Sequence, residues 1–252
     1  MFKGFYNLTS AMLTHGRMLD VISNNMSNTA TAGFKGDRFT GSTFQEVMWQ
    51  RVGNKIKYYE DIGEQSWITA PSQLYTDYSQ ASFDDTGMPL DFAIEGSGYF
   101  AVETEEGRIY TRGGSFSLDN EGYLTPPWQG RVLDVGGNPI RLVTDNLTTD
   151  GYGGLFTRNG VFLGRIGVFA FENDEEQLEK NAEGMFVAAE GAEPEQVFVT
   201  VHKGMLERSN VDWVREMTQM ISAQRAYQSA AEVIKMYDTV MNRITQEVGR
   251  LT

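Results

Sequence analysis

The sequence predicts an α+β protein. Its long N- and C-terminal helices are expected to pack as a coiled-coil-like pair, and the residues between them in the sequence are expected to form an all-β domain. Two observations predict this class. All six prolines lie between Pro71 and Pro194, and no glycine occurs from Met205 to Val248. Apolar residues at both ends recur at alternating steps of three and four, which is typical of helices that pack along a seam. We expect a helical assembly domain at 1–51 and 204–252, and a β-rich domain at 52–203.

The N-terminal helix is predicted from one apolar stripe with a single polar position. The stripe consists of Phe5, Leu8, Met12, His15, Leu19, Ile22 and Met26. The helix should end in the polar residues 24–28, because Asn and Ser side chains compete for backbone hydrogen bonds. A short helical continuation is expected from Gly41 to Arg51.

The C-terminal helix is predicted from about residue 213 to about residue 250, with Ser209 or Asn210 as its N-cap. It carries two neighbouring stripes, and one partner helix cannot cover both of them. The first stripe is Met217, Met220, Gln224, Tyr227, Ala231, Ile234 and Met241, and the second is Ala223, Ala226, Ala230, Val233, Tyr237, Val240, Ile244 and Leu251. The first stripe is expected to pack against the N-terminal helix, and the second is expected to face neighbouring subunits. The predicted assembly interface comprises Phe5, Leu8, Met12, Leu19, Ile22, Met217, Ile221, Gln224, Tyr227, Ile234, Tyr237, Met241 and Ile244.

The middle of the chain reads as short strands separated by turns, which indicates a β-sandwich or a partly open barrel. Turn residues such as Gly-Ser-Gly and Gly-Gly-Asn-Pro separate the strands. The expected strands are 92–94, 99–103, 108–111, 115–118, 123–125, 166–171, 185–188 and 197–201.

Composition excludes several classes of function. The net charge is −13, with 25 acidic and seven basic side chains in residues 59–200, so a nucleic-acid partner is not expected. There is no cysteine, and His15 and His202 are the two histidines, which leaves no basis for thiol chemistry or a typical zinc site. No apolar run reaches the ~18 residues of a membrane span. The N-terminus has no pattern of a cleaved secretory signal peptide.

The motifs that resemble catalytic or binding sites have simpler interpretations. Gly96-Ser-Gly98 begins like a dinucleotide-binding loop, but an apolar strand follows where a helix is needed, which favours a turn. The segment Ser117–Gly122 resembles a calcium loop, but Trp128 stands where the bidentate carboxylate should be. Acidic clusters such as Glu172–Glu176 are typical of a solvated face. We therefore predict no catalytic residue, no cofactor and no metal.

Three stretches together resemble the bacterial flagellar axial family, the rod and hook proteins. The first is Ser23-Asn-Asn-Met-Ser-Asn-Thr-Ala-Thr31-Ala-Gly33-Phe34-Lys35, with serines at two positions where the family usually has alanine. The second runs from Thr86-Gly87 through Leu90–Phe100 to Tyr110-Thr-Arg-Gly-Gly-Ser-Phe116. The third is Gly204–Asp212, followed by Glu216–Ile221 and Gln224-Arg-Ala-Tyr227. The family motif residues identified here are Asn24, Asn25, Asn28, Thr31, Gly33, Phe34, Lys35, Ser209, Asn210 and Val211.

The resemblance implies a non-enzymatic subunit of the flagellar basal-body rod, distal or proximal. In that family the terminal helices form the inner shell of a tube and the β domain lies outside. The implied partners are further copies of the chain, other rod and hook axial proteins, and the flagellar type III export apparatus. The implied location is the basal body, with export through an uncleaved signal and without membrane insertion.

Two other functions remain open from the sequence. The β domain could bind or cleave cell-wall glycan while the helices oligomerise, and a pair of carboxylates in a cleft would favour that interpretation. Alternatively, the chain could be a secreted effector that uses the same export route.

Overall fold

The computed structural model describes residues 2–52, 59–142, 144, 147–181, 183–248 and 250. The chain divides into two compact units. We call the first the terminal unit (Met1–Met26, Asp37–Tyr75 and Trp213–Thr252) and the second the β unit (Ser27–Gly36 and Thr76–Asp212). Each unit is described by itself.

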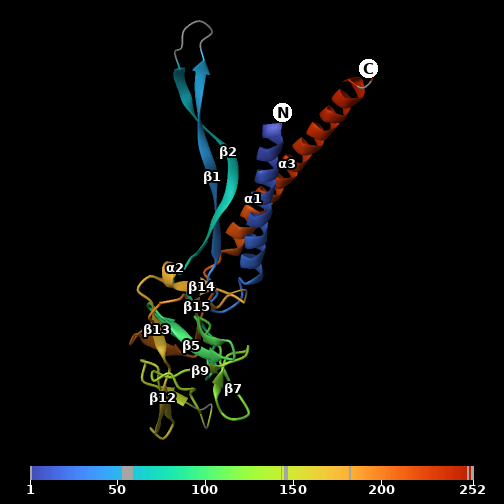
Figure 1. Ribbon diagram of the computed structural model, residues 1–252. Helices are drawn as coiled ribbons and strands as arrows, with labels where there is room; N and C mark the ends of the chain where they lie inside the picture. Colours follow the sequence, from blue (N-terminus) through green and yellow to red (C-terminus); the bar gives the residue numbers. More distant parts are fainter. Residues whose placement is uncertain are drawn as a thin grey trace. The chain divides into compact units, whose positions relative to one another are not determined.

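The terminal unit contains two long helices and a two-stranded ribbon (Figure 1). Helix α1 spans Phe2–Ser27 and helix α3 spans Trp213–Val248, which confirms both predicted helices. The ribbon pairs β1 (Asp37–Val52) with β2 (Tyr59–Thr76). Helix α1 ends within the polar residues that were predicted to stop it. Among the described residues, no helix combines the length and apolar character that a membrane span requires.

The predicted coiled-coil-like pairing of the terminal helices is wrong. The seam predicted on α3 is not enclosed: Ile221 is 44% exposed, and Met217, Tyr227 and Met241 are exposed as well. Among the side chains of α3 whose burial is described, the buried ones are instead Ala223 and Ala230, which belong to the second stripe. Both stripes have the same periodicity, so spacing alone could not choose between them. The structure buries these two small residues of the second stripe and leaves the large side chains of Met217, Tyr227 and Met241 in the first stripe exposed.

The predicted helical continuation from Gly41 to Arg51 is also wrong, because this segment lies in β1. Its sequence contains the β-forming residues Thr43, Phe44, Val47 and Trp49. A local reading missed the strand because its stabilising partner, β2, lies beyond the intervening residues 53–58.

The β unit is built from short antiparallel strands, as the sequence predicted for the middle of the chain (Figure 1). One sheet has the order β14-β15-β6-β5-β13-β16, with β9 also paired to β5. A three-stranded sheet has the order β10-β11-β12, and the pairs β17-β4, β18-β3 and β7-β8 form smaller sheets.

The elements of the β unit are β3 (Phe83–Asp85), β4 (Phe92–Glu95), β5 (Tyr99–Thr104), β6 (Gly107–Thr111), β7 (Ser117–Leu118), β8 (Leu124–Thr125), β9 (Arg131–Val132), β10 (Leu147–Thr149), β11 (Gly154–Thr157), β12 (Phe162–Arg165), β13 (Val168–Ala170), α2 (Asp174–Gln177), β14 (Leu178–Lys180), β15 (Phe186–Ala188), β16 (Glu195–Gln196), β17 (Thr200–Lys203) and β18 (Met205–Glu207). Strand β17 begins three residues after the expected start at Val197. The strands β3, β9, β10–β12, β14, β16 and β18 were not among the expected ones.

Two groups of buried side chains form the core of the β unit. The larger includes Phe92, Phe100 and Leu155, and the other includes Tyr99, Tyr110 and Phe186. Strand β5 contributes to both groups because successive side chains of a strand point to opposite faces. The sheet around β5 therefore separates two apolar layers.

Candidate functional site

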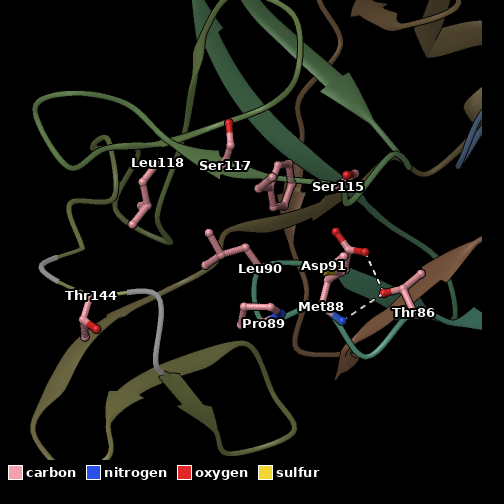
Figure 2. Close-up of a pocket in the computed structure, with 10 residues that line it drawn as sticks. Thr86, Met88, Pro89, Leu90, Asp91, Ser115, Ser117, Leu118 and Thr144 are labelled. Atoms are coloured by element: carbon pink, nitrogen blue, oxygen red, sulfur yellow. Dashed lines mark hydrogen bonds between the residues drawn. The ribbon is translucent and has the colours of Figure 1, made fainter.

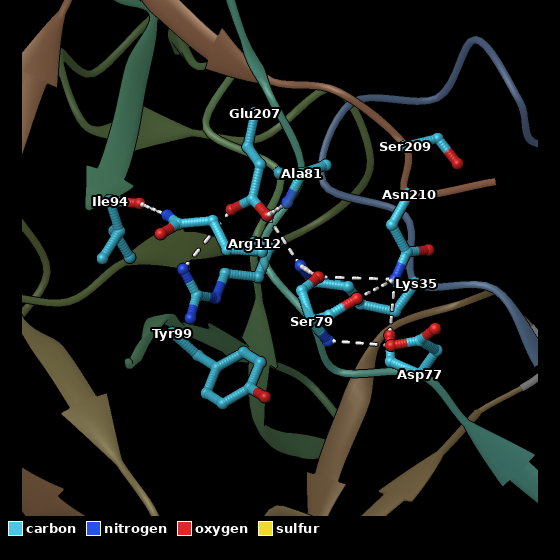
Figure 3. A network of polar contacts seen from close by, with 12 residues as sticks. Lys35, Asp77, Ser79, Ala81, Ile94, Tyr99, Arg112, Glu207, Ser209 and Asn210 are labelled. Atoms are coloured by element: carbon cyan, nitrogen blue, oxygen red, sulfur yellow. Dashed lines mark hydrogen bonds and ion pairs between the residues drawn. The ribbon is translucent and has the colours of Figure 1, made fainter. Parts of the chain in front are cut away.

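The three stretches of the flagellar resemblance meet at one buried polar cluster in the β unit (Figure 3). Lys35 comes from the N-terminal stretch, Arg112 from the middle stretch and Glu207 from the C-terminal stretch. Lys35 and Glu207 are both 0% exposed, and Arg112 is buried as well. We call these three residues the ion cluster.

The Lys35 side chain links the N-terminal stretch to the C-terminal stretch. Its Nζ lies 2.6 Å from Glu207 Oε1 and donates a second hydrogen bond to the Ser79 carbonyl at 2.8 Å. Burial lowers the pKa of the Lys35 ammonium, and the neighbouring Glu207 carboxylate opposes that shift. Glu207 thus offsets part of the cost of placing a cation away from water.

Glu207 is shared by two cations. Its Oε1 also accepts a hydrogen bond from the Ala81 backbone N–H at 3.0 Å, and its Oε2 lies 3.3 Å from Arg112 Nη1. Arg112 donates from Nη2 to the Gly96 carbonyl at 2.7 Å and stacks over the Tyr99 ring at 5.1 Å. One carboxylate therefore connects segments that are far apart in the sequence.

Tyr99 extends the polar contacts to α2. Its hydroxyl donates to Asp174 Oδ2 at 2.8 Å. Burial first, and then the Asp174 carboxylate, raise the pKa of Tyr99 far above its ordinary value. The Tyr99 hydroxyl is therefore held as a hydrogen-bond donor to Asp174.

The segment 31–36 is held in the β unit by backbone contacts as well as by Lys35. Gly33 N–H donates to the Glu207 carbonyl at 2.7 Å, and Gly36 N–H donates to Asn210 Oδ1 at 2.8 Å. Asn210 Nδ2 in turn donates to the Asp77 carbonyl at 2.6 Å. The Asn210 side chain thus bridges the N-terminal motif and the chain that leaves β2.

Gly33 and Phe34 explain why this motif needs a glycine followed by an aromatic residue. Gly33 has φ +71°, and a Cβ there would lie 2.2 Å from the Gly113 nitrogen, so a side chain would collide with the backbone beside Arg112. Phe34 is buried, and Lys180 Nζ lies 4.0 Å from its ring centre. Lys180 also donates to the Lys35 carbonyl at 2.6 Å.

The other family motif residues form local turns and caps. Asn25 is buried in the terminal unit, where it donates to the Asp37 carbonyl and accepts from the Asp37 N–H at 2.7 and 3.0 Å. Thr31 Oγ1 donates to Asn28 Oδ1 at 3.2 Å, and Ser209 Oγ accepts from Val211 N–H at 3.3 Å. Asn24 is exposed. Helix α3 begins at Trp213, so neither Ser209 nor Asn210 is its N-cap, and that prediction is wrong.

The ion cluster is suited to structural support. Its charged groups are enclosed, because Lys35, Arg112 and Glu207 are all buried. Glu207 and Arg112 stood within the quoted motifs, but their roles were not predicted.

The residues of the predicted assembly interface do not form one enclosed site. Ile22 is buried, and Leu8, Met12, Leu19, Ile234 and Tyr237 are partly buried. The exposed ones are Phe5, Met217, Ile221, Gln224, Tyr227, Met241 and Ile244.

A groove of about 940 Å³ is the larger of two depressions described in the β unit (Figure 2). Its lining includes Met88, Leu90 and Phe116, and Thr86 Oγ1 donates to the lining Asp91 carboxylate at 2.6 Å. The smaller depression has Glu183 as its lining carboxylate. Neither of these two depressions brings together the pair of carboxyl groups that glycan cleavage would need. Among the described residues, no group of three or more His, Asp or Glu side chains is placed to hold a metal ion.

The segments that resemble a dinucleotide-binding loop and a calcium loop both form turns. Gly96 and Gly98 have φ values of +103° and +135° and lie between β4 and β5. Asp119 Oδ1 accepts from the N–H groups of Glu121 and Tyr123 at 2.9 and 2.7 Å. Burial raises the pKa of Asp119, but these backbone donors and Arg131 outweigh it and hold the pKa below its ordinary value.

Two family models match the chain. The model described as "Flagellar basal body rod FlgEFG protein C-terminal" matches residues 202–247, which include Glu207, Asn210 and most of α3. The model described as "Flagellar hook protein FlgE/F/G D1 domain" matches residues 93–140, which include Arg112. Two members of the ion cluster thus lie in segments that define this family.

Curated relatives resemble the chain over nearly its whole length. The flagellar basal-body rod protein FlgF of Mesorhizobium japonicum is 33% identical over 252 residues, with 99% of each chain covered. The rod protein FlgG of Bacillus subtilis is 32% identical, covering 97% of this chain and 98% of its own. FlhO of Bacillus subtilis, named a flagellar hook-basal body complex protein, is 28% identical with both chains fully covered. The chain therefore belongs to the flagellar basal-body rod protein family.

Proposed function

We propose that the chain is a structural subunit of the flagellar rod and that it self-assembles into a tubular structure through its terminal helices. The observation that carries this proposal is the apolar surface left on α1 and α3. Contiguous exposed apolar surface is typical of an interaction site, and fully burying one such large side chain contributes roughly 1.5–3 kcal/mol.

The exposed apolar side chains lie along both helices. On α3 they recur with helical spacing, so they form faces rather than scattered positions. The set comprises Phe5, Tyr6 and Leu13 on α1, and Trp213, Val214, Met217, Ile221, Tyr227, Met236, Val240, Met241 and Ile244 on α3. Of the predicted interface, Phe5, Met217, Ile221, Tyr227, Met241 and Ile244 are therefore available to neighbouring subunits.

The family supports the finer parts of this proposal. Its relatives are named rod and hook-basal body complex proteins, so we infer that the partners are further copies of this chain and other axial proteins. We further infer that the chain is not an enzyme, that the type III export apparatus delivers it, that the segments 1–51 and 204–252 form the assembly domain, and that 52–203 forms the β-rich domain.

The experiment that tests the assembly interface is Ile221→Asp, with Ser222→Asp as its matched control on the same helix. Both residues are exposed, so neither substitution should alter the fold of the free chain. Ile221→Asp places a charge in the proposed interface and should abolish incorporation into the rod, whereas Ser222→Asp should lower it much less. Incorporation is measured by isolating basal bodies and by swimming motility.

Normal flagella with Ile221→Asp would contradict the proposed helix interface, provided that circular dichroism shows both purified variants to be folded. Equal loss with both substitutions would contradict it as well, because the effect would then come from added charge and not from the apolar face.

A further inference from the structure

The groove of the β unit has an apolar floor and an open lip (Figure 2). Leu90 and the buried Phe116 line the interior, and Met88 at the lip is 61% exposed. The Thr86–Asp91 hydrogen bond fixes the segment that carries the lip. A volume of about 940 Å³ is large enough to receive several side chains of a protein partner.

The hairpin that joins β11 and β12 has the opposite character, because it presents apolar side chains outward. Val161 is 58% exposed, and Phe162 is similarly exposed. Hydrogen bonds from Thr157 N–H to the Val161 carbonyl and from Gly160 N–H to the Thr157 carbonyl, both 2.8 Å, hold the turn. Val161 N–H also donates to Thr157 Oγ1 at 3.1 Å. A turn that is already ordered loses little conformational entropy when it binds.

The charges beside the two features are complementary. Arg158 lies exposed in the hairpin turn, and Asp84 lies exposed in β3, two residues before the groove residue Thr86. Within the described part of the chain, neither side chain has an ion-pair partner. The segment 84–91 carries three aspartates and no cation, so a cationic apolar hairpin fits this groove better than an acidic surface would.

We infer that the β11–β12 hairpin of one copy docks into the groove of a second copy, with Phe162 on the apolar floor, Val161 beside Met88 at the lip and Arg158 beside Asp84. This inference rests on the proposed function, because it names a second contact between assembling subunits. The two surfaces are different, so the contact is heterologous, and such contacts generate rings or open helical assemblies.

Engineered disulfides test the contact directly, because the natural chain has no cysteine. Full-length Val161→Cys is mixed with full-length Met88→Cys under mild oxidation. A disulfide requires the two Cα atoms to come within about 4.4–6.8 Å, so it should form between these two variants. The control pairs Met88→Cys with Val187→Cys, since Val187 is an exposed valine of β15 outside the hairpin. It should give several-fold less mixed dimer.

A charge swap tests the predicted ion pair. Adding Arg158→Glu to the Val161→Cys chain should lower the yield of mixed dimer about two- to fivefold, the range expected from an exposed ion pair. Adding Asp84→Arg to the Met88→Cys chain should restore the yield. All four positions are exposed, and circular dichroism of each variant checks that the fold is retained.

Two results would overturn the docking. One is a yield for the hairpin–groove pair that does not exceed the Val187 control, and the other is a Met88→Cys homodimer that forms in preference to the mixed dimer. Ile221→Asp separates this inference from the proposed function. If no mixed disulfide forms but Ile221→Asp still abolishes incorporation into the rod, the docking alone is overturned. If the mixed disulfide forms but Ile221→Asp leaves incorporation unchanged, only the helix interface is overturned.

Discussion

Glu207 shows how a single residue joins parts of the chain that are remote in sequence. Its side chain is fully buried between Lys35 and Arg112, and its backbone carbonyl receives the Gly33 N–H. Buried charges are tolerated only when their partners replace the lost water. Removing the shared carboxylate therefore affects both cations, whereas removing one cation leaves the other pair in place.

We predict that Glu207→Gln destabilises the β unit more than Lys35→Met does. The glutamine leaves two buried cations without a counter-ion, and breaking a buried pair in this way costs about 3–5 kcal/mol. Lys35→Met leaves Glu207 paired with Arg112 and should cost about 1–3 kcal/mol. Urea unfolding of the two variants measures the difference in the free energy of unfolding. The opposite order would show that Lys35, and not the carboxylate, organises the cluster.

Asp150 provides a prediction of pH dependence. Its Oδ1 accepts from the N–H groups of Tyr152 and Gly154, both at 2.8 Å, and its Oδ2 lies 3.2 Å from Arg165 Nη2. Burial raises the pKa of Asp150, but these donors and Arg165 outweigh it and hold the pKa below its ordinary value of 3.8. A lowered carboxyl pKa in the folded state stabilises the protein above the unfolded value, and this stabilisation is lost as the pH falls through the folded value.

Asp150→Asn should therefore lower the free energy of unfolding at about pH 5 and have a smaller effect at about pH 2. Asparagine keeps an oxygen that can accept both backbone hydrogen bonds, so the variant removes the charge and its titration. Urea unfolding at a series of pH values measures the difference between the two proteins. A difference that does not change with pH would mean that the charge of Asp150 has no part in stability.

At the scale of elements, the motif segment 31–36 determines how the chain enters the β unit. Its backbone lies against Glu207 and Asn210, and Phe34 packs beneath Lys180. Gly33 allows this close approach because it combines a positive φ with the absence of a Cβ. The same segment that supports the family resemblance is thus a packing element.

We predict that Gly33→Ala destabilises the β unit more than Gly191→Ala does. Both glycines have positive φ, +71° and +88°, so both substitutions strain the backbone by about 1–2 kcal/mol. At Gly191 a Cβ would meet no atom within 4 Å, whereas at Gly33 it would collide with the Gly113 and Arg112 backbone. Thermal unfolding measures the stability of the two variants. Their difference gives the effect of the steric clash, because the backbone strain is common to both. Equal losses of stability in the two variants would show that the segment 31–36 can shift to accommodate a Cβ at Gly33 without further destabilisation.

For the whole molecule, charge and apolar surface act in opposite directions. The central residues 59–200 carry a net charge of −18, which favours separation of free chains by mutual repulsion. The helices expose apolar faces that favour association. Contacts between copies must therefore be specific, and we expect them where apolar surface is large or where a cation meets the acidic segment 84–91 beside the groove. The Ile221 and hairpin experiments test these two places separately.

The sequence by itself determined the existence of α1 and α3, the β-rich middle and the flagellar family. Each of these follows from local periodicity, from turn residues or from motifs that can be read along the chain. The tertiary structure decided which stripe of α3 is buried, because both stripes have the same spacing and only contact selects the small residues Ala223 and Ala230.

Pairing between distant segments likewise could not be predicted from the sequence. The strand β1 required β2 as its partner, and the ion cluster required Lys35, Arg112 and Glu207 to meet across 172 residues of chain. Each of these residues occurs in a motif, but a charge that is buried and a charge that is solvated look the same in a sequence. Burial and pairing are properties of the folded chain, so only the structure could identify them.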